Sequence, residues 1–316
     1  AVVRALQNNN EIIEGTSIPA QLKAVKNETE LNGFKVAMQK DGVALVKFLY
    51  WLKNNIGKIA LSEYDISKKL TEFRSEEKEF RGESFPPIVG YRNHGAIVHL
   101  SVGEKNANKL EPEGILLFDS GGHYWEGTTD ITRTVALGTV TQKQQSDFTL
   151  VLKGLIALSM AKFPIGTKGC HLDILARQAL WDKGLNYGHG TGHGVGHYLA
   201  VHEGPFRIRQ EYNDYNIQPG MVMSNEPGIY REGEYGIRIE NMIACVNKEE
   251  TEFGSFLGFE TLSLCPIDID LIDTDLLTPT EKWWLNSYHK KVREILYPYL
   301  KEELQQFLLQ VTREVV

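Results

Sequence analysis

Apolar residues recur every three or four positions over much of the chain, a spacing typical of helices that bury one face. The first such stretch opens with Asn27 and Glu30, a pair that resembles a capping box, and the second opens with Ser62 and Asp65. The pattern predicts helices over residues 27–54, 62–76, 141–163, 171–184 and, with a break or kink at Pro298, 278–311.

Shorter apolar runs bounded by turn residues predict strands between these helices. Residues 115–121 and 130–137 flank a glycine-containing turn and predict one hairpin, and residues 218–230 and 235–246 predict a second. Ahead of the first hairpin, we expect a loop for FPPIVGYR and a strand for GAIVHL. Helices and antiparallel hairpins in one unit imply an α+β fold.

Composition excludes several classes of protein. The chain has 316 residues, of which 42% are hydrophobic and 24% charged, with a net charge of −7. It has no run of Lys and Arg suited to a nucleic-acid or membrane surface, and its apolar stretches are too short to span a bilayer. Cys170, Cys245 and Cys265 are unclustered, so we expect buried free thiols and a cytoplasmic protein.

Four carboxylates and one histidine are the candidate chemical groups. Asp119 and Asp130 lie in the first predicted hairpin, Glu226 and Glu240 in the second, and His193 in the glycine-rich stretch between them. Four ionised carboxylates in one pocket repel each other, whereas two divalent cations balance their charge. Oxygen-rich ligation suits Mn or Mg, and the imidazole also admits Co, Fe or Zn. Such a metal pair can make a nucleophile from water at neutral pH.

Taken alone, each of these residues has a simpler interpretation, as a solvated strand face or a loop histidine. Their joint occurrence on two hairpins favours the metal site. Arg238 lies two residues before Glu240, so both side chains face the same way on a strand, and we expect the guanidinium to grip a ligand carboxylate with two nitrogens. Thr132 has the same relation to Asp130. The glycines of GHGTGHGVGH are expected to let the backbone approach the metals or take positive φ.

Other histidines are candidates for contact with a substrate. His99, His189 and His202 are not needed as ligands and are suited to donate hydrogen bonds to a carbonyl or to carry a proton to a leaving amine. His197, four residues beyond His193, fits either packing or the wall of the site.

These motifs resemble the metal-site motifs of the pita-bread metallopeptidases, a family that includes methionine aminopeptidase, prolidase and aminopeptidase P. The similar segments are FDSGGHYWEGTTDITRT, HGTGHGVGHYLAVHEGP, SNEPGIY and GIRIEN. The resemblance extends from about Pro19 to the end and is closest to the catalytic domain of the long, three-domain Xaa-Pro aminopeptidases. It implies a curved antiparallel sheet backed by helices, with a pseudo-twofold axis between two halves. Residues 1–18 are then a linker or the remnant of an upstream domain, and residues 19–316 are the catalytic domain with a C-terminal helical extension.

The resemblance implies a role for each candidate ligand. Asp119 is a terminal ligand of one metal, Asp130 and Glu240 bridge the two metals, and His193 and Glu226 hold the other. Glu226 also accepts a proton from the attacking water. The metals implied are two divalent ions, usually Mn²⁺.

Roles in binding and activity follow from the same resemblance. Substrate binding and proton shuttling fall to His99, His189 and His202. The implied reaction is hydrolysis of the N-terminal Xaa-Pro bond of peptides through a metal-bridging hydroxide, by a homodimer that binds neither nucleic acid nor membrane. One alternative is a prolidase, which acts on dipeptides and needs a positive group for their free carboxylate. The other is a non-catalytic peptide-binding module of the same fold, against which the intact ligand set argues.

Overall fold

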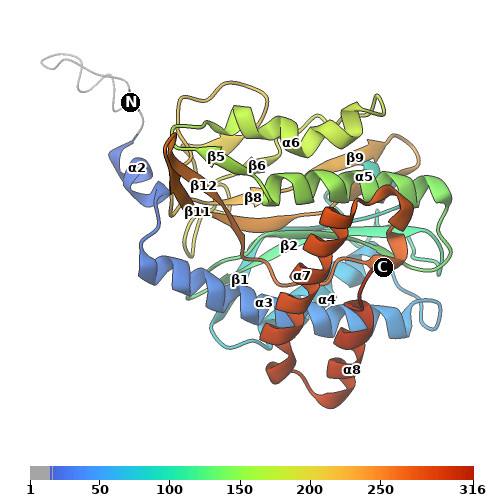
Figure 1. The fold of residues 1–316 in the computed structure, drawn as a ribbon. Helices are drawn as coiled ribbons and strands as arrows, with labels where there is room; N and C mark the ends of the chain where they lie inside the picture. Colours follow the sequence, from blue (N-terminus) through green and yellow to red (C-terminus); the bar gives the residue numbers. More distant parts are fainter. Residues whose placement is uncertain (1–14, 16) are drawn as a thin grey trace, which may run out of the picture.

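The structure is a computed structural model that describes Gly15 and residues 17–316. Antiparallel strands form the middle of the molecule, with α5 and α6 on one side of them and α3 and α4 on the other (Figure 1). This arrangement confirms the α+β class. Almost all of the expected linker, residues 1–18, lies outside the described residues. Among the described residues, no helix has both the length and the apolarity needed to cross a membrane.

The first half of the chain contributes helices and one antiparallel sheet, in which β2 lies between β1 and β4. The expected capping box of Asn27 with Glu30 is present, and Ser62 with Asp65, the expected start of the second helix, forms another. The elements are α2 (Ile18–Ala24), α3 (Glu28–Asn55), α4 (Glu63–Ser75), β1 (Phe80–Tyr91), η1 (Arg92–Ala96), β2 (Ile115–Tyr124), β3 (Gly127–Thr128) and β4 (Ile131–Ala136).

The second half repeats this plan with another helix pair and a sheet of order β5-β12-β11-β8, beside two short strand pairs. Each half supplies two of the four carboxylates, as the expected pseudo-twofold requires. The elements are α5 (Gln142–Ser159), β5 (Lys162–Pro164), α6 (Gly169–Trp181), β6 (Gly192–His193), β7 (Arg207–Ile208), β8 (Val222–Asn225), β9 (Gly228–Arg231), β10 (Tyr235–Arg238), β11 (Asn241–Thr251) and β12 (Gly254–Thr261).

The C-terminal region returns to helices that pack beside α3 and α5. The predicted helix over 278–311 is interrupted at Pro298, as expected, because that residue lies in a 3₁₀ turn between two helices. The elements are η2 (Ile269–Leu271), η3 (Thr274–Leu276), α7 (Pro279–Leu296), η4 (Tyr297–Tyr299) and α8 (Glu302–Val311).

Three expectations about local structure are wrong. FPPIVGYR, expected as a loop, lies in β1 except for Arg92, which begins η1. GAIVHL, expected as a strand, completes η1 and continues without regular structure. β1 is an edge strand whose register shifts between Phe85 and Ile88, so the prolines there remove no ladder hydrogen bond. Cys170 is only partly buried in the first turn of α6, whereas the other two free cysteines are buried.

The second predicted hairpin is also broken where its carboxylates lie. Glu226 separates β8 from β9, and Glu240 separates β10 from β11. Consequently β9 pairs with β10, while β8 pairs with β11 in a different sheet. At the second break, the Glu240 amide donates to Thr132 O at 3.0 Å, so this candidate ligand is anchored to β4 of the opposite half.

Arg133 is a buried cross-link between the two halves and the C-terminal region. Its Nη1 donates to Glu240 O at 2.5 Å and its Nε to Pro266 O at 3.0 Å. Its Nη2 donates to Cys265 O and to the Tyr288 hydroxyl of α7, both at 2.9 Å. The backbone of Glu240 therefore has a fixed position relative to both β4 and α7.

A buried ion pair holds β2 against the first helix pair. Arg74 of α4 donates from Nε and Nη2 to the two carboxylate oxygens of Asp41 in α3, at 2.7 and 3.2 Å. The Tyr124 hydroxyl donates to the same carboxylate at 3.0 Å, and Arg74 also reaches Ser120 O at 3.4 Å. Because Ser120 follows Asp119, this pair helps to position the first candidate ligand.

We expect Asp41→Ala to lower the free energy of unfolding by about 3–5 kcal/mol, because it leaves the Arg74 guanidinium buried and unpaired. Urea unfolding followed by both fluorescence and circular dichroism measures the change and tests two-state behaviour. Glu72→Ala, which removes only the exposed pair with Lys69, is the control and should change stability by less than about 0.5 kcal/mol. Equal unfolding midpoints for the two variants would contradict the assignment.

Candidate metal centre

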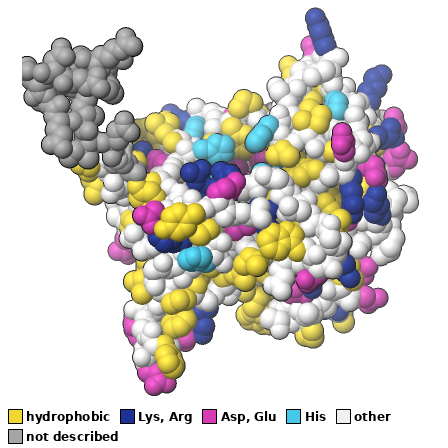
Figure 2. Space-filling model, turned by 90° about the horizontal axis from the view of Figure 1, so that it is seen from above, with side chains coloured by type: hydrophobic (Ala, Val, Ile, Leu, Met, Phe, Trp, Pro, Cys, Tyr) yellow, Lys and Arg dark blue, Asp and Glu magenta, His cyan; other side chains and the backbone are white. Residues whose placement is uncertain are grey.

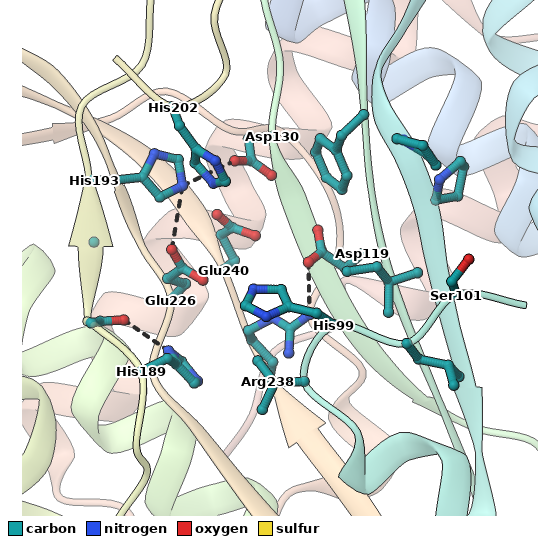
Figure 3. A pocket seen from close by; sticks show the side chains of 18 of the residues that line it. His99, Ser101, Asp119, Asp130, His189, His193, His202, Glu226, Arg238 and Glu240 are labelled. Carbon is teal, nitrogen blue, oxygen red and sulfur yellow. Dashed lines mark hydrogen bonds and ion pairs between the residues drawn. The ribbon is translucent and has the colours of Figure 1, made fainter. Parts of the chain in front are cut away.

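All five predicted ligands line one cavity of about 680 Å³ between the two halves (Figure 3). Asp119 comes from β2 and Asp130 from the residue before β4. His193 ends β6, while Glu226 and Glu240 lie at the two strand breaks. Segments more than 100 residues apart in the chain therefore supply neighbouring side chains.

The ligand atoms lie close enough to share cations. His193 Nε2 is 3.4 Å from Asp130 Oδ2 and 3.4 Å from Glu226 Oε1. One ligand atom each from Asp130, His193 and Glu240 all lie within 4.8 Å of one another. Asp119 lies across the cluster from His193 and is hydrogen-bonded to Arg238 (Figure 3).

Without cations, burial makes this cluster retain protons. Burial raises the pKa of Glu226 to about 7 and that of Glu240 well above its ordinary range, and it also raises the pKa of Asp130. Burial alone favours neutral His193, but the hydrogen bond to Asp130 and the charge of Glu226 outweigh it and raise its pKa to about 9. The cluster is therefore not a stable set of free anions.

Two carboxylate oxygens in this cluster are unpaired. Asp119 Oδ1 and Glu240 Oε1 are buried and have no hydrogen-bond partner among the described residues. Buried acceptors without partners are rare because each loses its hydration without compensation. A donor set of carboxylate oxygens and one imidazole, with two oxygens unpaired, fits a pair of divalent cations.

The sequence predicted that Arg238 would bind a ligand carboxylate through two nitrogens, but only one nitrogen contacts a carboxylate. Its Nη2 donates to Asp119 Oδ2 at 2.6 Å, Nη1 to the Tyr230 hydroxyl at 2.7 Å, and Nε to Thr132 Oγ1 at 3.2 Å. The Thr132 hydroxyl in turn donates to Glu240 Oε2 at 2.7 Å. In Asp119 and in Glu240, one carboxylate oxygen thus accepts a hydrogen bond from the protein, and the second oxygen accepts none.

The three candidate substrate histidines also line the cavity (Figure 3). The ring of His202 packs edge-on against that of His193, with centroids 4.3 Å apart, and burial lowers the pKa of His202. Burial lowers the pKa of His189 to about 3, so this ring is neutral. Its Nδ1 lies 2.8 Å from Gly190 O and its Nε2 2.8 Å from the Tyr230 hydroxyl. A donating Nδ1–H leaves Nε2 as the acceptor for Tyr230.

The glycines around His193 serve packing rather than unusual backbone angles. A Cβ at Gly192 would lie 2.1 Å from Ser224 O, and one at Gly194 2.0 Å from Glu203 O. None of the glycines from residue 188 to residue 196 has a positive φ. Their small size lets β6 lie directly against β8. His197, which had two interpretations, packs edge-on against Phe34 with centroids 5.6 Å apart.

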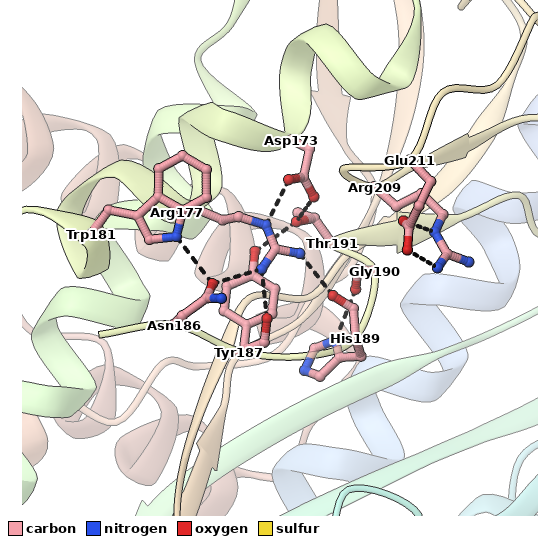
Figure 4. Close-up of polar contacts among 10 residues, drawn as sticks. All are labelled: Asp173, Arg177, Trp181, Asn186, Tyr187, His189, Gly190, Thr191, Arg209 and Glu211. Atoms are coloured by element: carbon pink, nitrogen blue, oxygen red, sulfur yellow. Dashed lines mark hydrogen bonds and ion pairs between the residues drawn. The ribbon is translucent and has the colours of Figure 1, made fainter. Parts of the chain in front are cut away.

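Sequence reasoning missed a buried network behind the cavity (Figure 4). Arg177 of α6 donates from Nε to Asp173 Oδ2 at 2.6 Å and from Nη2 to His189 O at 2.8 Å. Thr191 Oγ1 donates to Asp173 Oδ1 at 2.5 Å, and Thr191 O accepts from the Glu226 amide at 2.8 Å. The only sequence signal was an Asp and an Arg four residues apart on a helix, which is equally typical of a solvated pair.

Two family models match the chain. One is metallopeptidase family M24, over residues 32–247, and the other is the C-terminal region of the same peptidase family, over residues 255–315. A protein named probable Xaa-Pro aminopeptidase P from Paracoccidioides brasiliensis (strain Pb03) is 45% identical over 306 residues, covering 95% of this chain and 50% of that protein. Aminopeptidase P1 of Lotus japonicus is 42% identical over 335 residues, covering 98% and 51%. The chain thus spans about half the length of the curated relatives it matches.

Solved structures agree with the family models. The X-prolyl aminopeptidase of Caenorhabditis elegans, described as a cytosolic enzyme with a di-nuclear active site, matches with a TM-score of 0.94 and 36% identity, covering 99% of this chain and 52% of that one. A Xaa-Pro dipeptidase from Bacillus anthracis matches with a TM-score of 0.69 and 28% identity, covering 82% and 67%. The expected pita-bread fold is confirmed, and the chain belongs to metallopeptidase family M24.

Proposed function

We propose that residues 19–316 are the catalytic domain of a Xaa-Pro aminopeptidase, which uses two divalent metal ions to remove the N-terminal residue of peptides whose second residue is proline. The observation that carries this proposal is the convergence of four carboxylates and one imidazole from both halves into one cavity. The names of the relatives at 42–45% identity support the proline specificity.

Each candidate ligand has a place in this proposal. Asp119 would bind one cation, Asp130 and Glu240 would bridge the two, and His193 and Glu226 would bind the other. Oxygen-rich ligation suits Mn²⁺, which is the metal we propose, although Co²⁺, Zn²⁺ or Fe²⁺ would fit the same set. Paired divalent cations lower the pKa of a water molecule toward neutrality and stabilise negative charge on a carbonyl oxygen.

Other residues would control charge and orientation. Arg238 and Thr132 each hold one oxygen of a carboxylate, so the free oxygens of Asp119 and Glu240 have fixed directions. Glu226 would accept a proton from water at a carboxylate oxygen and release it to the leaving nitrogen.

The cavity also suits a substrate with proline in second position. A peptide bond to proline has no N–H, so recognition falls to its carbonyl groups and its ring. His99 and His202 would donate hydrogen bonds to carbonyl oxygens, and the apolar wall formed by Phe85, Pro86 and Ile88 would contact the ring. His189, linked to Tyr230 and through it to Arg238, would maintain the hydrogen bonds around Asp119.

Location and assembly are part of the same proposal. We propose a cytoplasmic enzyme, in keeping with the cytosolic description of the Caenorhabditis elegans relative and with three free cysteines. The homodimer is an expectation from the family resemblance, and sedimentation analysis of the purified chain tests it.

Peptide assays test the function directly. After reconstitution with MnCl₂, we expect turnover of Ala-Pro-Ala and none of Met-Ala-Ala, because the cavity wall selects proline. Elemental analysis of the same sample should find two metal ions for each chain. Turnover of Ala-Pro alone would identify a dipeptidase instead, and turnover of Met-Ala-Ala alone would overturn the proline specificity.

Two substitutions separate a metal ligand from a substrate contact. Glu240→Ala should abolish both turnover and the full metal content, because it removes a proposed bridging ligand. His202→Ala should retain both metals and lower kcat by about 10²- to 10⁴-fold, the range for loss of a positioned proton donor or acceptor. Assays paired with elemental analysis make the comparison. Loss of metal from His202→Ala would make that histidine a ligand.

The pKa shifts predict how the metal stabilises the fold at different pH. Glu226 and His193 both have raised pKa values in the metal-free protein, about 7 and about 9, so the stability that their protons contribute is lost as pH rises through these values. A cation that displaces the protons binds more tightly at higher pH. We therefore expect MnCl₂ to raise Tm more at pH 8 than at pH 5.5. Thermal scans of chelator-stripped protein measure both shifts, and a shift that is equal or larger at pH 5.5 would contradict the ligand set.

A further inference from the structure

The cavity has a cationic wall next to the candidate metal centre. Arg207 and Arg209 both line the cavity, and Arg207 begins β7. In the β6–β7 pair, Arg207 lies directly opposite His193. Residues directly opposite in an antiparallel pair lie on the same face, with Cα atoms about 4.5–5.5 Å apart. The Arg207 side chain therefore leaves the backbone beside that of a proposed metal ligand.

The arginines that line the cavity differ in what they bind. Arg238 is buried and its nitrogens are used by Asp119 and other protein groups. Arg209 pairs through Nε and Nη2 with the two carboxylate oxygens of Glu211 (Figure 4). The Arg207 guanidinium is exposed and has no hydrogen bond or ion pair with any described residue. Arg207 is therefore the lining arginine free to bind a ligand.

Resting on the proposed function, we infer that Arg207 is a carboxylate-binding residue on the leaving-group side of the cleft. A guanidinium binds a carboxylate with two parallel hydrogen bonds, which makes arginine the residue best suited to this group. An aminopeptidase cleaves after the first residue of its substrate, so the rest of the peptide, including its terminal carboxylate, lies on the leaving-group side.

The dimensions suit a short peptide. Each extended residue adds at most about 3.3–3.6 Å, so the carboxylate of a tripeptide lies about two residue lengths from the N-terminal carbonyl carbon. The Cα atom of Arg207 lies about 4.5–5.5 Å from that of His193, and Arg207 lines the same cavity. Two sources share this chemistry: the terminal carboxylate of a tripeptide, and an acidic side chain on the residue after proline.

This role predicts an effect on binding rather than on the chemical step. The carboxylate is the same in the bound substrate and in the transition state, so its contact with Arg207 contributes equally to both. Removal of the contact should therefore raise KM and leave kcat unchanged. Arg209 should contribute little to substrate binding while its guanidinium is paired with Glu211.

Three substrates and two matched variants test the inference on the Mn²⁺-loaded chain. The substrates are Ala-Pro-Ala with a free carboxylate, its C-terminal amide, and Ala-Pro-Glu amide. We expect Arg207→Gln to raise KM about tenfold for a carboxylate-bearing substrate, as loss of one charge-assisted contact implies, and to leave the amide unchanged. Arg313→Gln removes an exposed arginine outside the cavity and should change none of these values.

The source of the carboxylate follows from which KM rises. An increase confined to Ala-Pro-Ala identifies the terminal carboxylate, an increase confined to Ala-Pro-Glu amide identifies the side chain, and either supports the inference. Glu211→Gln should lower KM for the same substrate, because it frees Arg209.

Failure of the inference is distinct from failure of the proposed function. If the unmodified chain cleaves all three substrates and Arg207→Gln alters no KM, or alters that of the amide equally, the inference is overturned while the proposed function stands. If none of the three is cleaved by metal-loaded protein, the proposed function itself fails.

Discussion

Mutual repulsion among four carboxylates is the constraint on which the rest of this structure depends. Asp119, Asp130, Glu226 and Glu240 lie in one partly closed cavity, where low polarity strengthens the repulsion. Burial already raises the pKa values of the last three. A flexible scaffold would let these groups move apart into water, so the fold must hold them in place before any cation binds.

Two devices provide this rigidity. Glu226 and Glu240 lie at breaks in otherwise extended segments, and each backbone amide at a break bonds to a different element, Thr191 O in one case and Thr132 O in the other. Around them, charged groups are paired inside the protein: Arg238 with Asp119, and Arg177 with Asp173. These buried pairs are costly to assemble and more costly to break singly, so they favour one arrangement of the cavity.

Local signals in the sequence predicted much of the fold and the candidate site. Polar caps such as Asn27 and Ser62 mark helix starts because their hydrogen bonds are made within four residues. The residues missed are those whose environment comes from distant segments. Nothing in the sequence near Pro86 indicates an edge strand, because a strand lies at an edge only when no other strand pairs with its second side. Likewise the guanidinium of Arg133 is buried against the carbonyl groups of Glu240 and Cys265, which lie far away in the sequence.

The hydrogen bonds of Arg133 have a consequence for the boundary of the catalytic unit. Its Nη1 donates to the Glu240 carbonyl, while Nη2 of the same guanidinium donates to the Cys265 carbonyl and to the hydroxyl of Tyr288 in α7. The terminal helices are therefore not an appendage to the peptidase core. A proteolytic nick or a shortened gene that removed α7 would remove the Tyr288 hydroxyl from a guanidinium bonded directly to the Glu240 backbone, so damage at the end of the chain would be transmitted to the cleft.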